Sequence, residues 1–184
     1  MKKIQIKKKT KTVLTKLNEI TITQLESCYN ILENKEGSQI DKWNEVICEL
    51  SDISSDEVEE IPFNEQLELI QAINITNMPQ DKVKVIEEIK LKDKCFRAKK
   101  IINGKEMELI TPYIISNPKN YLLYLAAIIY KEIDKDGNLI KDYSEDGIQQ
   151  RKELFKELKA DVIMPFLIII QKYLVEKANA KGLE

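Results

Sequence analysis

The stretch that decides the fold is VIMPFLIII, Val162–Ile170, a run of nine apolar residues near the end of the chain. It is about half as long as a membrane-spanning helix, which needs about 20 mostly apolar residues. A helix that is apolar on every side is a buried helix. Asp161 is a good N-cap for it, and Pro165 fits because it lies near the first turn. We therefore expect this helix to form the centre of the core, and we expect no membrane-spanning segment.

The bulk composition describes a chain with material for both a core and a charged surface. Of its 184 residues, 43% are hydrophobic and 33% are charged, and the net charge is −2. This balance argues against a nucleic-acid binder, because such proteins carry an excess of positive charge. The opening MKKIQIKKKTK has charges but no apolar segment after them, so we expect no signal peptide and a protein that stays in the compartment where it is made.

The residues that usually carry enzyme chemistry are missing or scattered. The chain has no histidine, which excludes Ser-His-Asp and Cys-His nucleophile systems and histidine-ligated zinc. Cys28, Cys48 and Cys95 form no CxxC pair, so we expect buried free thiols in a reducing compartment. We therefore predict that the protein is not an enzyme and holds neither a metal ion nor a cofactor. A carboxylate-dependent enzyme is the alternative that stays open.

One loop has some of the residues of a calcium-binding loop. An EF-hand needs glycine at its sixth position and a bidentate glutamate at its twelfth. With Gly137 at the sixth position, Tyr143 stands at the twelfth, so the match fails. We predict a turn at Asp136-Gly137 instead.

The remaining patterns predict an α+β fold, mostly helical with a small antiparallel sheet, as a single domain over residues 1–184. Ile4 and Ile6 alternate with polar residues, which is typical of a strand. The lysines around them have two interpretations. They form an electrostatic arm for phosphate or an acidic partner, or they protect the edge of a strand. The second interpretation accounts for them without a ligand.

From about residue 21 to 75 the sequence predicts a helical part. Pro62 ends one of its helices and opens the next. The expected N-caps are Thr23 with Glu26 three residues later, Ser38 or Asp41, Ser54 or Ser55, and Asn64. An acidic cluster in this part is either a metal site or a solvated helix N-terminus, where negative charge is favoured. That cluster consists of Asp56, Glu57, Glu59 and Glu60.

From about residue 83 to 115 the sequence predicts a β part. Val83–Ile86 has the pattern of a strand, although Glu87–Ile89 is also compatible with a helical turn. A hairpin is expected over about residues 95–111, because Asn103-Gly104 is a strong signal for a tight turn. From about residue 117 to 178 we expect helices again, beginning at Asn117-Pro118, with one over about 147–159 and the last from Asp161.

The last helix also supplies the predicted interaction site. A chain of this length buries only about 70% of its unfolded surface. A run as apolar as Val162–Ile170 is therefore expected to leave some area uncovered at its exposed end, and an exposed apolar patch commonly marks a partner site. The candidate interface residues are Phe166, Ile169, Ile170 and Tyr173.

Four stretches resemble small proteins of tailed bacteriophages, especially tail assembly chaperones and neck or tail-completion proteins. The order of these stretches covers most of the chain, and each combines a helix with its cap. They are LNEITITQLESCYNIL (17–32), ICELSDISSDEVEEIPFNEQLELI (47–70), KNYLLYLAAIIYK (119–131) and RKELFKELKADVIMPFLIIIQKYL (151–174).

The resemblance implies a non-enzymatic viral structural or assembly protein that acts through protein–protein contacts. Its expected partners are other virion or tail proteins or further copies of itself, as a homo-oligomer or ring, without a specific nucleic acid or a membrane. Its expected location is the host cytoplasm during assembly, and the virion if it remains in the particle. The alternative hypothesis is a small regulatory or inhibitory binding module that masks a host protein.

Overall fold

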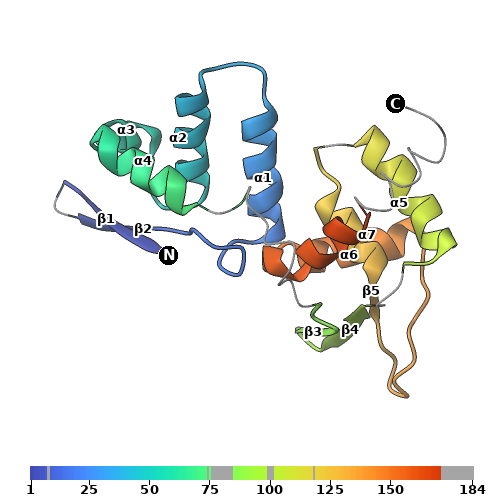
Figure 1. Ribbon diagram of the computed structural model, residues 1–184. Helices are drawn as coiled ribbons and strands as arrows, with labels where there is room; N and C mark the ends of the chain where they lie inside the picture. Colours follow the sequence, from blue (N-terminus) through green and yellow to red (C-terminus); the bar gives the residue numbers. More distant parts are fainter. Residues whose placement is uncertain (8, 74, 76–84, 99–101, 118, 171–184) are drawn as a thin grey trace.

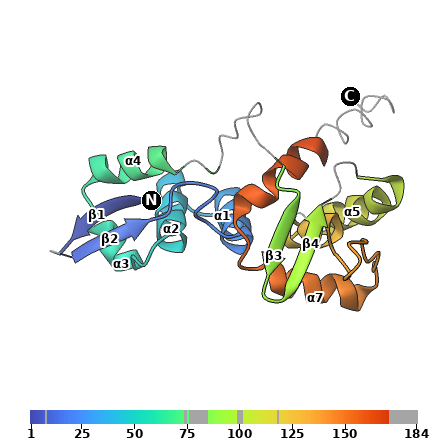
Figure 2. The same cartoon turned by 90° about the horizontal axis from the view of Figure 1, so that it is seen from below.

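The structure is a computed structural model, and it describes all residues except 8, 74, 76–84, 99–101, 118 and 171–184. Its helices and strands lie in two groups that are separate in both views (Figures 1 and 2). We call the described residues up to 75 the N-terminal unit and those from 85 to 170 the C-terminal unit. The fold is α+β, mostly helical with two small antiparallel sheets, which confirms the predicted class. Within the described residues, no helix is both long and apolar enough to cross a membrane.

The N-terminal unit opens with a β-hairpin. Strands β1 (Lys2–Ile6) and β2 (Lys9–Val13) pair antiparallel, and Lys7 has a φ of +47° at the turn. Ile4 and Ile6 are buried, as their alternation with polar residues predicts. Four helices follow: α1 (Ile22–Glu33), α2 (Gln39–Glu49), α3 (Ser55–Glu59) and α4 (Phe63–Ala72).

Three of these helices begin with reciprocal caps. In each, the N-cap side chain accepts from the backbone N–H three residues on, and the side chain at that position accepts from the N-cap N–H. The N-cap residues are Thr21, Ser38 and Ser54. The prediction that Thr23 caps α1 is therefore wrong by two residues, because Thr21 and Gln24 form the box instead.

Helix α4 begins without a side-chain cap. Its N-cap residue is Pro62, whose carbonyl accepts from the N–H groups of Glu65 and Gln66. Asn64 lies inside the first turn, so the prediction that Asn64 caps this helix is wrong. The helix begins before Asn64 because the Pro62 carbonyl already accepts the first helical hydrogen bonds, with a φ of −53° at Pro62.

The C-terminal unit combines a three-stranded antiparallel sheet with helices. The strand order is β3-β4-β5, so the middle strand pairs with a neighbour on each side. The elements are β3 (Glu88–Leu91), β4 (Lys94–Ala98), α5 (Gly104–Ser116), α6 (Leu122–Ile129), β5 (Tyr130–Glu132), α7 (Glu145–Phe155), a 3-10 helix (Ala160–Val162) and a last helix over 164–170.

The hairpin predicted at Asn103-Gly104 is wrong, because these residues start helix α5. Asn103 has φ −86° and ψ 170°, and its side chain accepts from the N–H of Glu106 at 3.0 Å. The Glu106 carboxylate accepts in return from the N–H of Asn103 at 2.9 Å. Asparagine is favoured both in tight turns and at N-caps, so the same residue served the second role. The hairpin of this unit instead turns at Lys92-Asp93, where Lys92 has a φ of +55°.

Other boundaries in this unit also differ from prediction. Glu88 and Ile89 belong to β3, so the helical turn that Glu87–Ile89 left open as an alternative does not form. The strand expected at Val83–Ile86 lies partly outside the described residues, and residues 85 and 86 are in no strand. Helix α6 begins at Leu122 rather than at Asn117-Pro118, of which 118 lies outside the described residues. The turn at Asp136-Gly137 is confirmed, with a φ of +81° at the glycine.

The two closing helices are also shifted relative to their expected bounds. Helix α7 starts after the cap residue Ser144 and ends at Phe155, before the expected limit near residue 159. Asp161 lies within the 3-10 helix rather than at the N-cap of the last helix. Pro165 is in the first turn of the helix over 164–170, where a proline is tolerated.

Helix α1 joins the two units. It packs against α2 on one side and α6 on the other (Figure 1). The backbone N–H of Ile22 donates to the carbonyl of Leu158 at 2.8 Å, and the N–H of Ala160 donates to the carbonyl of Ile20 at 2.9 Å. One hydrophobic cluster includes buried side chains from both units.

Candidate interaction surfaces

The run Val162–Ile170 lies in the core, as predicted. Residues 162–167 are buried, and the Phe166 ring packs edge-on against Tyr130 with 5.8 Å between the ring centres. Of the candidate interface residues, Phe166 and Ile170 are buried, at 0% and 2% exposed, whereas Ile169 is 40% exposed. Ile170 is one turn after Phe166 and shares its buried face, and Ile169 is rotated away from it. Tyr173 lies outside the described residues.

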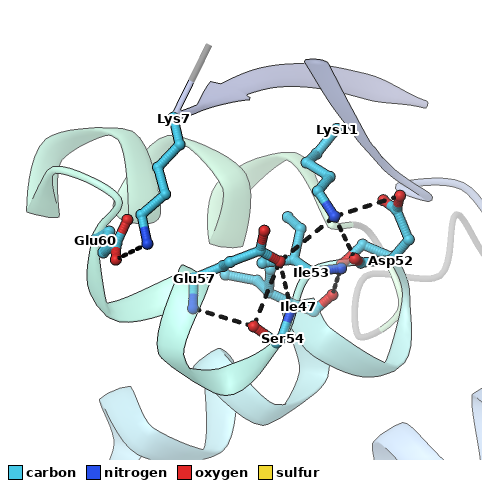
Figure 3. A network of polar contacts seen from close by, with 9 residues as sticks. Lys7, Lys11, Ile47, Asp52, Ile53, Ser54, Glu57 and Glu60 are labelled. Carbon is cyan, nitrogen blue, oxygen red and sulfur yellow. Dashed lines mark hydrogen bonds and ion pairs between the residues drawn. The ribbon is translucent and has the colours of Figure 1, made fainter. Parts of the chain in front are cut away.

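Two lysines of the first hairpin pair with residues of the acidic cluster 56–60, for which metal binding was one of the two interpretations. Figure 3 shows Lys7 and Lys11 reaching from the hairpin to helix α3 and the residues beside it. The Lys7 ammonium lies 2.6 Å from a Glu60 carboxylate oxygen, and Lys11 lies 3.4 Å from Glu57 and 3.5 Å from Asp52. The hydrogen bond that the Lys7 ammonium donates to Glu60 raises the pKa of Lys7. Lys7 and Lys11 thus pair with Glu60 and Glu57 of the acidic cluster, which accounts for these four charges without a ligand.

A buried polar cluster lies between α5 and β5. The Lys131 side chain is fully buried, and its ammonium contacts both the Glu106 carboxylate and the Tyr143 hydroxyl. The Tyr143 hydroxyl also donates to Glu106 at 2.9 Å. Burial raises the pKa of Glu106, but hydrogen bonds from Lys131, Asn103 and Tyr143 outweigh it and leave the pKa below its ordinary value. This cluster is a satisfied ion pair that fixes β5 against the first turn of α5.

This cluster was not predicted from the sequence. Its signal was Lys131 at the end of the apolar segment YLLYLAAIIYK, since a lysine adjoining so apolar a segment needs a partner if it is buried. The cluster has limited catalytic use as it stands, because a general acid or base must come within hydrogen-bond reach of a substrate. Glu106 is 2% exposed. Among the described residues, no group of three or more Cys, Asp or Glu side chains is arranged to hold a metal ion.

The cysteines are free thiols. Cys28 is buried in α1, and burial raises its pKa to about 12, so it stays protonated at neutral pH. Cys48 and Cys95 are half-buried, which is less than the sequence predicted for them.

Exposed apolar residues on two helices are the strongest candidates for partner contacts. On α4, Phe63 is 63% exposed and Leu67, one turn later, is 39% exposed. We call this pair the α4 stripe. On α5, Ile115 is 75% exposed at the edge of a groove of about 560 Å³. We call this hollow the α5 groove, and the described residues that line it are Gly104, Met107, Glu108, Thr111, Pro112, Ile115 and Ser116.

Neither surface was foreseen from the sequence. Residues 104–111 were assigned to a hairpin. Phe63 was the residue that could have indicated the α4 stripe. It is an aromatic residue at the first position of α4, directly after Pro62 and before the buried residues Gln66 and Leu69. Comparisons of the chain with protein-family models, with curated proteins and with solved structures gave no match.

Proposed function

We propose that this chain is a non-enzymatic structural or assembly protein of a tailed bacteriophage, as a tail, neck or ring component or a tail assembly chaperone. It acts through contacts with other virion or tail proteins and with copies of itself, in the host cytoplasm during assembly. The observation that carries the proposal is the pair of exposed apolar surfaces, the α4 stripe and the α5 groove. Exposed apolar patches of this kind mark partner sites in proteins that otherwise bury such residues.

Two further features support apolar protein contacts over catalysis and over electrostatic binding. The buried ionisable groups Glu106 and Lys131 pair with each other and so are engaged in holding the fold. Lys7 and Lys11, which would have to be available for an electrostatic arm, are paired with acidic residues. The resemblance of the four helix-and-cap stretches to phage tail and neck proteins gives the proposal its biological setting.

A complementation experiment tests this function. The gene is deleted from the phage genome, and the wild-type chain is supplied from a plasmid. We expect the deletion to yield particles without complete tails, seen by electron microscopy, and the plasmid to restore them. Complete tails and normal particle yields without the gene would contradict an assembly role. Normal tails together with impaired growth of the phage would favour the module that masks a host protein.

A further inference from the structure

The two units repeat one arrangement of elements. Each opens with an antiparallel hairpin, and the residue directly after its first strand is a lysine with positive φ, Lys7 at +47° and Lys92 at +55°. In each unit, two helices follow the hairpin. The last residue of the hairpin then pairs with a residue just after the second of these helices. Val13 bridges to Ser51, shortly after α2, and Ala98 pairs with Tyr130, directly after α6.

The helices correspond in the same order. The first helix of each unit, α1 or α5, begins with a reciprocal cap. The third, α3 or α7, follows a serine cap. The last helix of each unit has a Pro-Phe dipeptide near its start, with Pro62 as the N-cap before Phe63 in one unit and Pro165-Phe166 inside the first turn in the other. The contact between the units is therefore a contact between two versions of one building block.

At this junction, one face of α1 is covered by the C-terminal unit. The face contains Ile22, Glu26 and Asn30, which are spaced four residues apart. A Glu26 carboxylate oxygen accepts from the N–H groups of Leu122 at 2.5 Å and Leu123 at 3.2 Å. Helix α6 has no side-chain cap of its own, so Glu26 supplies its cap from the other unit.

The corresponding face of α5 is exposed in the part of the chain that the structure describes. Alignment of the two N-caps, Thr21 with Asn103, places Gly104, Glu108 and Pro112 at the positions of Ile22, Glu26 and Asn30. All three line the α5 groove, and all three are exposed. The second unit thus carries an apolar face with a carboxylate at the position where the first unit uses Glu26 to cap a helix.

The chain itself offers an occupant for this face. At the junction, α1 is covered by the start of α6 and by the segment ahead of the last helix of the C-terminal unit. The equivalent part of the N-terminal unit is the segment before its last helix, α4, together with the start of that helix. Helix α4 lacks a side-chain cap and exposes Phe63 and Leu67. An uncapped helix start with apolar side chains matches the groove and the carboxylate of Glu108.

We propose that copies of this chain join head to tail, with the start of α4 of one copy seated in the α5 groove of the next. Glu108 accepts hydrogen bonds from the first amides of α4, and Phe63 and Leu67 pack against Pro112 and Ile115. Because the two surfaces differ, the contact is heterologous and produces a ring if the rotation between copies closes, or a filament if it does not. The inference rests on the proposed assembly function and names its partner.

The test uses the full-length chain and its mass in solution, measured by light scattering after size exclusion over a range of concentrations. We expect the wild type to form multimers larger than dimers. Ile115→Asp and Phe63→Asp should each give a single-chain mass, because each removes one of the two surfaces. Both side chains are more than half exposed, so circular dichroism should show an unchanged fold. The matched control is Ile140→Asp, which changes an exposed isoleucine at 42% outside both surfaces and should leave the multimer intact.

Mixing the two variants separates this geometry from a symmetric one. Ile115→Asp retains a working α4 stripe and Phe63→Asp retains a working groove, so an equal mixture should form dimers and nothing larger. A variant that carries both Phe63→Asp and Ile115→Asp should have a single-chain mass at every concentration, because it lacks both surfaces. Glu108→Gln should weaken assembly about tenfold, because a charged acceptor forms stronger hydrogen bonds than the amide oxygen that replaces it.

Three outcomes would overturn the inference. One is a wild-type chain that stays single at every concentration. Another is a Phe63→Asp variant that still multimerises, which would indicate a symmetric α5 contact. The third is a wild type that is a single chain in solution together with an Ile115→Asp variant of lower thermal stability. This result would indicate that the chain itself covers the groove. If any of these results is found and the complementation experiment still restores tails, the assembly function holds and the chain acts on a different partner.

Discussion

At the scale of single residues, Glu26 shows how one buried carboxylate links the two units. It is 8% exposed, and one of its oxygens accepts from two backbone N–H groups of α6. Burial raises its pKa above the ordinary value, although the hydrogen bonds from Leu123 and Leu122 oppose this. The carboxylate thus satisfies two amides that would otherwise lack a partner, while its charge is held in a poorly solvated place.

Replacing Glu26 separates these two effects. Glu26→Ala should lower the free energy of unfolding by about 1–3 kcal/mol for each amide left without an acceptor. Glu26→Gln keeps an acceptor oxygen and removes the buried charge, so its loss should be much smaller. Urea unfolding followed by circular dichroism measures both. Equal losses for the two variants would show that the charge, rather than the acceptor, matters.

The raised pKa of Glu26 also gives the sign of a pH dependence. The folded state binds this proton more tightly than the unfolded state, so the contribution of Glu26 to stability falls as pH rises from its ordinary value of 4.5 through the raised pKa. The stability of Glu26→Gln relative to the wild type should therefore increase with pH across that window and level off above it.

At the scale of secondary-structure elements, the start of α5 decides the architecture of the C-terminal unit. Asn103 and Glu106 cap the helix reciprocally, and Glu106 also pairs with Lys131 of β5. One side chain therefore fixes both the first residue of α5 and the position of the strand beside it. The two-residue hairpin expected at Asn103-Gly104 would have placed Glu106 in a strand and left Lys131 without this partner.

Substitutions at Asn103 and Gly104 distinguish the helix start from the hairpin. Asn103→Ala should lower the free energy of unfolding by about 1 kcal/mol because it removes the cap. Gly104→Ala should cause no loss, since nothing lies within 4 Å of a Cβ built there and its φ is not positive. Thermal unfolding of both variants is the measurement. A large loss at Gly104 with none at Asn103 would restore the hairpin.

At the scale of the whole molecule, the two units share a core and should unfold together. Phe166 is fully buried beside Tyr130 in the C-terminal unit, and Trp43 lies half-buried in α2 of the N-terminal unit. The chain has a single tryptophan, so its fluorescence follows the N-terminal unit alone. The hydrogen bonds across the junction couple the two units.

Phe166→Ala should therefore destabilise both units. We expect a loss of about 3–5 kcal/mol for truncating a buried phenylalanine. The transition followed by Trp43 fluorescence should shift as much as the one followed by circular dichroism, as in two-state unfolding. The control is Ile169→Ala, at a side chain that is 40% exposed, with a much smaller shift. An unshifted Trp43 transition would mean that the units unfold independently.

Sequence by itself determined the features that depend on neighbouring residues. The alternation of Ile4 and Ile6 predicted β1, and serines at 38 and 54 were foreseen among the helix caps. The continuous apolarity of Val162–Ile170 predicted a helix in the core. These patterns are local, because a cap or a buried face is set by residues a few positions apart.

Tertiary structure alone decided which distant groups meet. Asn103-Gly104 is compatible with a turn or a cap, and Lys131, 25 residues beyond Glu106, stabilises the cap that occurs. Glu26 has the spacing of a capping residue for its own helix, yet it caps α6, 96 residues away. Lys11 meets Asp52 and Glu57 because the hairpin folds over α3. Such choices cannot be read from local patterns, because a side chain that has several possible partners takes the one that packing brings within reach and shields from water.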